Sequence, residues 1–156
     1  MAQRFSARIT SAWAPTRVFD YLADFRNLPE WHPIVTSAEL TTLDWSLRNA
    51  RYDLRATIAG RRIAAEVTTT ELERPKLIVA TAQNQAAITT DRFELAPGAN
   101  DVTVVNYSSV LQLKLPLRAI GQLMVPALNG AWDSAVSGLE GVIGAGIPRA
   151  SGPLAS

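Results

Sequence analysis

Polar and apolar residues alternate along most of the chain between residues 4 and 113. A period of two is typical of strands with one covered face, because successive side chains point to opposite sides. Turn-forming residues such as Gly60-Arg61 interrupt the alternation. The pattern predicts seven strands, at residues 4–13, 36–43, 51–59, after the Gly60-Arg61 turn, 77–82, 87–95 and 102–113.

Residues 117–143 follow a different period, with polar residues spaced by three, four and seven. This spacing predicts one long amphipathic helix. Its polar side carries Gln122, Asn129, Asp133, Ser137 and Glu140, and its apolar side carries Ile120, Met124, Ala127, Ala131, Ala135, Gly138 and Val142, flanked by Leu123, Leu128, Trp132 and Leu139. Pro126 removes one backbone donor, so we expect a kink there. The small residues on the apolar side permit either close packing or room for a ligand.

Two short helical segments are predicted between the first and second strands. Ala14-Pro15-Thr16 opens a helix that ends near Asn27, and the prolines that follow allow one further helical turn. Seven strands with few intervening helices favour a mainly antiparallel sheet, which the long helix is large enough to cover. The expected architecture is a single α+β domain over residues 1–143, with a Gly, Pro, Ala and Ser tail at 144–156.

Composition excludes several classes of partner. The chain has 156 residues, a formal net charge of +1 and no cysteine. This charge gives no reason to expect nucleic acid as a partner, and the lack of cysteine excludes disulfides and thiolate metal sites. No apolar run has the length of a membrane span or the features of a signal peptide, so we expect a cytoplasmic protein. His32 is the single histidine, and no metal is expected.

Four segments carry a family resemblance: APTRVFDYLADFRNLPEWHP, VTTTELERPKLIVATA, DRFELAPGANDVTVVNY and LPLRAIGQLMVPALNGAWDSAVSGLEGVIG. In this order they resemble the polyketide cyclase/dehydrase branch of the SRPBCC superfamily, also described as START-like or Bet v 1-like. The resemblance implies a helix-grip fold, in which a seven-stranded antiparallel sheet curls around the long C-terminal helix. It also implies an internal cavity for a hydrophobic small molecule, and no cofactor. With a cavity implied, the small helix residues favour space for a ligand.

Asp91 is the leading candidate for chemistry in such a cavity. It shares a strand face with Thr89, Phe93 and Leu95, and that face should turn inward. An unpartnered carboxylate there would have a raised pKa and would suit removal of a proton next to a carbonyl group. Two alternatives stay open: a buried ion pair with an arginine, and a bulge that turns the side chain outward.

Other polar and aromatic residues could complete the site. Tyr107 and Tyr52 could donate a hydrogen bond to a ligand carbonyl or enolate, or could simply pack with the hydroxyl on a backbone partner. His32 could relay protons or serve only the structure of its turn. The further candidates for substrate contact are Thr69, Thr81, Ser109, Phe93, Met124, Ala127, Leu128, Ala131, Trp132 and Trp31.

The resemblance leads to the hypothesis of a cofactor-independent cyclase or dehydratase acting on a polyketide-like or polycyclic intermediate. Asp91 would be the base, Tyr107 or Tyr52 would stabilise the enolate, and His32 would relay protons. The alternative is a carrier that binds a lipid, steroid or aromatic ligand without changing it. A third reading, an interaction module, requires a collapsed cavity and an exposed apolar patch. The sequence leaves the ligand and the oligomeric state open, a homodimer included.

Overall fold

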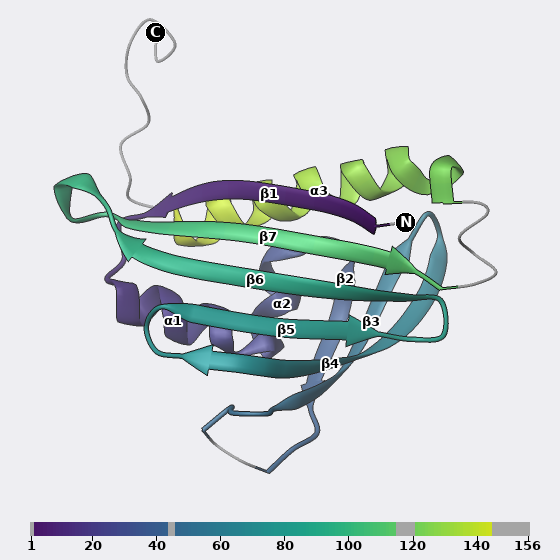
Figure 1. The fold of residues 1–156 in the computed structure, drawn as a ribbon, viewed down its shortest axis with the longest axis horizontal. Coiled ribbons are helices and arrows are strands. Elements are labelled where there is room, and N and C mark those ends of the chain that lie inside the picture. The colour runs from purple at the N-terminus through teal and green to yellow at the C-terminus, as the bar shows by residue number, and fades with distance from the viewer. Residues whose placement is uncertain (1, 44–45, 115–120, 145–156) are drawn as a thin grey trace, which may run out of the picture.

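Figure 1 shows the computed structural model, which describes residues 2–43, 46–114 and 121–144, except for the side chains of residues 121–124. The elements in chain order are β1 (Ala2–Ser11), α1 (Pro15–Ala23), the 3-10 turn η1 (Phe25–Asn27), α2 (Leu28–Trp31), β2 (Val35–Leu40), β3 (Arg51–Ile58), β4 (Arg61–Glu73), β5 (Leu77–Gln83), β6 (Ala87–Pro97), η2 (Ala99–Asp101), β7 (Thr103–Leu113) and α3 (Gly121–Ile143). The predicted α+β architecture is confirmed.

The seven strands form one antiparallel sheet in the order β1-β7-β6-β5-β4-β3-β2. The sheet is curled, and α1, α2 and α3 all lie on its inner side (Figure 1). Alternate residues of each strand face this side. On β7 these are Thr103, Val105, Tyr107, Ser109 and Leu111, and all of them are buried. The hydrophobic core therefore lies between the inner face of the sheet and the helices.

The C-terminal half of α3 is packed most tightly. Ala135, Leu139 and Ile143 are fully buried, and the backbone carbonyl of Ile143 accepts a hydrogen bond from the Ser11 hydroxyl. Where α3 crosses α2, a Cβ atom added to Gly138 would lie 2.0 Å from the carbonyl oxygen of Trp31. The helices approach this closely because Gly138 has no side chain.

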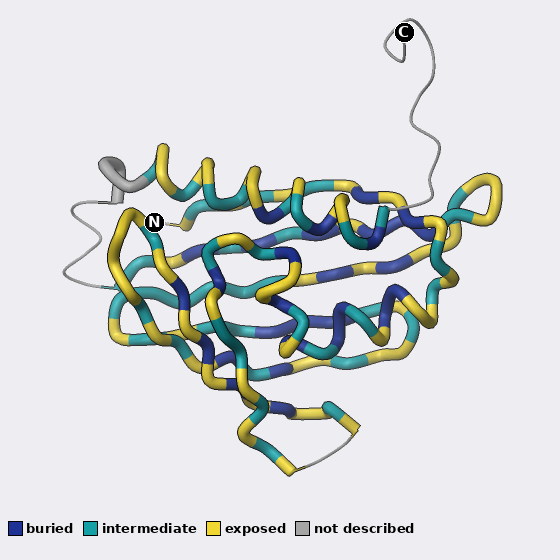
Figure 2. The backbone as a smooth tube through the Cα atoms, turned by 180° about the vertical axis from the view of Figure 1, so that it is seen from behind, coloured by how far each residue is buried: buried dark blue, intermediate teal, exposed yellow. Residues whose placement is uncertain are grey.

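The first half of α3 is more open, as Figure 2 shows by its exposed and half-buried residues. Ala127 is exposed in the free chain, and its contact with a ligand stays a prediction. Further along the helix, Ala135, Leu139 and Ile143 are fully buried, because α2 and β1 cover that part of it. The helix continues through Pro126. The predicted first turn at 117–120 and the tail at 145–156 lie outside the described residues.

None of the helices in the described ranges has both the length and the apolar character needed to cross a membrane.

Candidate functional site

The site is built on one row of register partners that crosses five strands. We call it the Asp91 row, and it consists of Phe5 on β1, Ser109 on β7, Asp91 on β6, Ala80 on β5 and Thr69 on β4. Directly paired residues project to the same face of a sheet. The pairing of β6 with both neighbours is regular around Asp91, so the alternative of an outward bulge does not apply. Asp91 therefore lies on the inner face, as its parity predicts.

The Asp91 carboxyl has an unusual electrostatic environment. Within the described part of the chain it forms no salt bridge, and the three ion pairs found there involve other residues. Burial raises its pKa from 3.8 to about 6, and the neighbouring Ser109 hydroxyl offsets part of this effect. Asp91 as a whole nevertheless keeps some solvent exposure. A carboxyl that is crowded by protein atoms and still partly accessible suits a wall of a ligand site.

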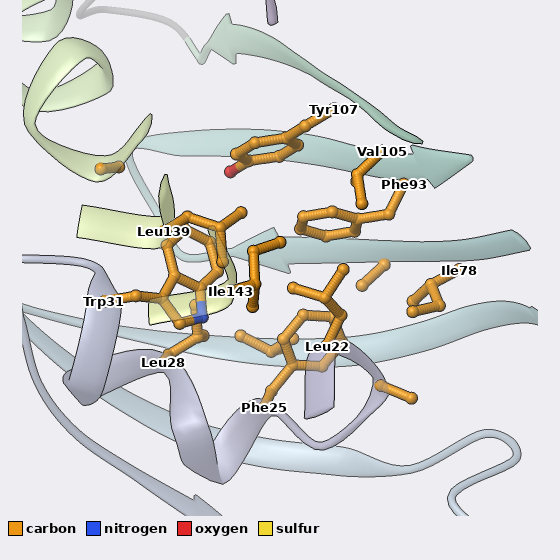
Figure 3. Close-up of a cluster of buried hydrophobic side chains, with 14 of the residues drawn as sticks. Leu22, Phe25, Leu28, Trp31, Ile78, Phe93, Val105, Tyr107, Leu139 and Ile143 are labelled. Carbon is orange, nitrogen blue, oxygen red and sulfur yellow. The ribbon is translucent and has the colours of Figure 1, made fainter. Parts of the chain in front are cut away.

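An aromatic cluster lies on the next row. Tyr107 stacks on Phe93 with ring centroids 4.3 Å apart, and Trp132 of α3 lies 4.6 Å from Tyr107. Trp31 of α2 approaches both Phe93 and Tyr107 edge-on, at 6.3 and 6.0 Å. The cluster joins the sheet to two helices, and Figure 3 shows Tyr107 and Phe93 lying ring against ring opposite Trp31. It forms an apolar surface beside the Asp91 carboxyl.

Sequence reasoning missed Phe5 as a site residue. Its ring stacks on Trp132 at 5.2 Å, and it ends the Asp91 row on β1. Phe5 and Trp132 are half-buried residues, whereas Phe93 and Trp31 are buried. The alternation of β1 already placed Phe5 on an apolar face, and this was the available signal.

Tyr107 carries a hydroxyl that is protonated at any ordinary pH. Burial and the nearby Asp91 carboxylate raise its pKa well above the usual value. In Figure 3 the hydroxyl points toward the side on which Trp31 and Leu139 lie. Tyr107 and Asp91 sit diagonally across β7 and β6, so a phenol donor and a carboxylate acceptor are close neighbours on the inner face.

Tyr52 and His32 are placed less favourably for chemistry. The Tyr52 ring is fully buried beside Phe25, and its hydroxyl lies 3.5 Å from the Ala23 carbonyl oxygen that accepts its hydrogen bond. Burial raises the pKa of Tyr52 to about 12. The His32 ring contacts Trp31, and burial lowers the pKa of His32 to about 4. His32 is thus neutral at neutral pH and a weak base, which speaks against a proton relay.

The remaining predicted contacts divide between the two faces of the sheet. Thr81 pairs with Thr68 and Thr90, and these residues have the opposite parity from Ala80 and Asp91. The prediction that Thr81 lines the site is wrong, because its side chain projects from the outer face.

On α3, Leu128 and Ala131 are half-buried. The side chain of Met124 lies outside the described residues.

The described residues include no group of three or more His, Cys, Asp or Glu side chains that could hold a metal ion. The polar groups that the fold brings together on the inner face are instead the Asp91 carboxyl and the hydroxyls of Ser109, Thr69 and Tyr107.

Comparisons with known proteins agree with this architecture. The family model described as polyketide cyclase / dehydrase and lipid transport matches residues 2–144. A START superfamily protein from Mycobacterium smegmatis is similar in structure, with 17% identity, a TM-score of 0.74, and coverage of 90% of this chain and 97% of that one. The Zhui aromatase/cyclase from Streptomyces sp. R1128 has 12% identity, a TM-score of 0.63, and coverage of 94% and 99%.

A major latex-like protein from Panax ginseng matches at 8% identity with a TM-score of 0.65, covering 94% of this chain and 99% of that one. At such low identity these structures show only the fold, which is the START/Bet v 1 helix-grip fold. No curated relative matches the sequence.

Proposed function

The chain belongs to the polyketide cyclase / dehydrase and lipid transport family, and from this premise we propose that it binds a polycyclic or polyketide-like molecule against the inner face and catalyses its cyclisation and dehydration. The family and its aromatase/cyclase structural neighbours support a hydrophobic ligand-binding domain. Ligand binding is inferred from the family, and the proposed reaction is inferred from the chemistry of the residues on the Asp91 row.

The observation that carries the proposal is the state of Asp91. Its carboxyl lies on the inner face, forms no salt bridge within the described ranges, and has a pKa raised to about 6. A base with a pKa slightly below neutral is ionised at pH 7 and still holds a proton well enough to remove one from carbon. A carboxylate whose only task was structural would be expected to have a cationic partner.

In the proposed reaction, the Asp91 carboxylate removes a proton from a carbon next to a ligand carbonyl. The resulting enolate carbon attacks a second carbonyl carbon of the same ligand, so that a carbon–carbon bond forms and the second oxygen becomes an alkoxide. Protonated Asp91 returns its proton to that alkoxide. In the dehydration, Asp91 removes another α-proton, a carbon–carbon double bond forms, and the hydroxyl leaves as water with the proton from Asp91. One water is lost, and no oxidant is needed.

Tyr107 and the aromatic cluster would assist this reaction. The Tyr107 hydroxyl keeps its proton, so it can donate a hydrogen bond to the developing enolate oxygen. A planar ligand would stack on the rings of Phe5 and Trp132, which are half-buried residues. Holding a flexible substrate in a folded conformation also lowers the entropic part of the barrier.

The test is to incubate stoichiometric protein with a panel of aromatic polyketides, sterols and fatty acids, and to recover every compound for chromatography and mass spectrometry. A cyclised isomer, or a product lighter by one water, supports the proposal. If compounds are retained by the protein and all returned unchanged, the chain acts on them as a carrier. A panel in which nothing is retained contradicts ligand binding for these classes.

A further inference from the structure

Thr69, at the β4 end of the Asp91 row, has a hydroxyl with no hydrogen-bond partner among the described residues. The residue is 1% exposed, and within the described part of the chain its Oγ1 meets neither a protein partner nor bulk water. The backbone N–H of Thr69, in contrast, has a partner, since it donates to the Ala50 carbonyl oxygen at 2.9 Å. Burying an unpaired hydroxyl destabilises the folded chain, and valine would fill the same volume without this cost.

Two other buried hydroxyls on the inner face, those of Thr103 and Ser11, are satisfied. Thr103 is fully buried, and its hydroxyl donates to the Trp13 carbonyl oxygen at 2.7 Å. Ser11 is fully buried and donates to the Ile143 carbonyl oxygen. The difference is thus specific to Thr69 and is not a general feature of threonine and serine in this sheet. An unpaired buried hydroxyl lowers the stability of the fold. Its presence here therefore indicates a role in binding a group from outside the chain.

The place of Thr69 in the row indicates what that partner is. Thr69 and Asp91 are register neighbours of the same residue, Ala80, on opposite sides. One strand, β5, lies between them, so two inter-strand spacings place their Cα atoms about 10 Å apart. The residue between them carries only a methyl group. A ligand ring lying over Ala80 would present one edge to Asp91 and the opposite edge to Thr69.

We propose that the Thr69 hydroxyl is the second polar anchor of the site and donates a hydrogen bond to a ligand carbonyl oxygen across the ring from the atoms that face Asp91. The proposal rests on the function proposed above and narrows its substrate class to ring systems with oxygen on two opposite edges. Thr69 and Ala80 are both buried in the free chain, so this binding mode requires the side chains that cover them to move aside when the ligand binds. Thr69 is a binding residue in this scheme and takes no part in proton transfer.

The test compares two probes that differ by one oxygen. 6-Hydroxy-1-tetralone carries a carbonyl and a phenol on opposite edges, and the corresponding tetrahydronaphthol lacks only the carbonyl oxygen. Binding is measured by calorimetry with the full chain and its Thr69→Val and Thr69→Ser variants. The wild-type chain should bind the ketone about three- to tenfold more tightly, the effect of one hydrogen bond. Thr69→Val should bind both probes equally, and Thr69→Ser should restore the preference.

A stability measurement accompanies the binding test, with Thr103→Val as the matched control. Thr69→Val should raise the Tm because it removes an unpaired hydroxyl, whereas Thr103→Val should lower it because it breaks a hydrogen bond. If both probes bind the wild-type chain and the Thr69→Val variant keeps the preference for the ketone, the role of Thr69 is wrong while the proposed function stands. If neither probe binds the wild-type chain, the proposed function fails for this ligand class, and the role of Thr69 fails with it.

Discussion

The inner face of the sheet has two ends that differ in burial and in hydrogen bonding. At the closed end, Ile9, Val105 and Phe93 are almost completely buried, and the hydroxyls of Ser11 and Thr103 are satisfied. At the open end, Asp91 and the residues beyond it on β6, Thr89 and Ala87, are half-buried. The closed end stabilises the fold, whereas the open end keeps polar groups that cost stability. Such a cost is typical of a functional site.

The largest expected effect concerns the open end. Asp91→Asn keeps the shape of the side chain and removes the base, so turnover of any substrate found in the panel should fall about 10²- to 10⁴-fold. The dissociation constant should change little, because the amide can still form hydrogen bonds. Single-turnover rates and calorimetric titrations on the same preparations separate the two quantities. Undiminished turnover in Asp91→Asn would remove Asp91 from the mechanism.

The next effect tests the closed end. Gly138→Ala would place a Cβ atom 2.0 Å from the Trp31 carbonyl oxygen, so α3 must move away from α2. We expect the free energy of unfolding to fall by about 3 kcal/mol or more. Gly130→Ala in the same helix is the control, since its Cβ meets nothing within 4 Å. Helix propensity should make that variant more stable by up to about 1 kcal/mol. Equal stabilities measured by urea denaturation would contradict the close contact.

The raised pKa of Asp91 should make the free energy of unfolding depend on pH. Its folded pKa of about 6 lies above its usual value of 3.8, so the unfolded chain ionises first as the pH rises. Stability therefore falls between about pH 4 and 6, by on the order of 2–3 kcal/mol. The depressed pKa of His32 acts in the opposite sense, because its contribution is present above about 6.5 and is lost as the pH falls toward 4.

Asp91→Asn separates these two contributions, because both proteins retain His32. Urea denaturation of the two proteins at about pH 4 and about pH 7.5 should show the variant gaining stability relative to wild type at the higher pH. A difference between the proteins that stays constant with pH would mean that the Asp91 pKa is not raised.

The smallest effect concerns Tyr52, whose ring is fully buried beside Phe25. Its hydroxyl makes a single long hydrogen bond to the Ala23 carbonyl oxygen. Tyr52→Phe should cost less than about 1 kcal/mol of stability and leave ligand binding unchanged. Thermal denaturation and calorimetry provide the two measurements. A marked loss of binding in Tyr52→Phe would place this hydroxyl in contact with the ligand.

Thr81 shows where sequence reasoning failed. Residues 77–80 are apolar at every position, so the alternation in β5 does not say which face Thr81 occupies, and only pairing with Thr68 and Thr90 decides it. On α3, the spacing of polar residues indicates a helix with one apolar side. How deeply each position along that side is buried depends on where α2 and β1 end, which is not a local property.

The sequence by itself determined the elements and their faces, because the periods of two and 3.6 are local consequences of backbone geometry. It therefore predicted the seven strands, the long helix and the inward parity of Asp91. Only the tertiary structure decided which polar groups find partners. Among the described residues, Asp91 has no salt bridge and the Thr69 hydroxyl has no partner, and both facts depend on distances between strands far apart in the chain. The alternation places Asp91 and Thr69 on the inner face whether or not their side chains have partners. For Asp91, the pattern alone could therefore not distinguish a structural carboxylate from one available for catalysis.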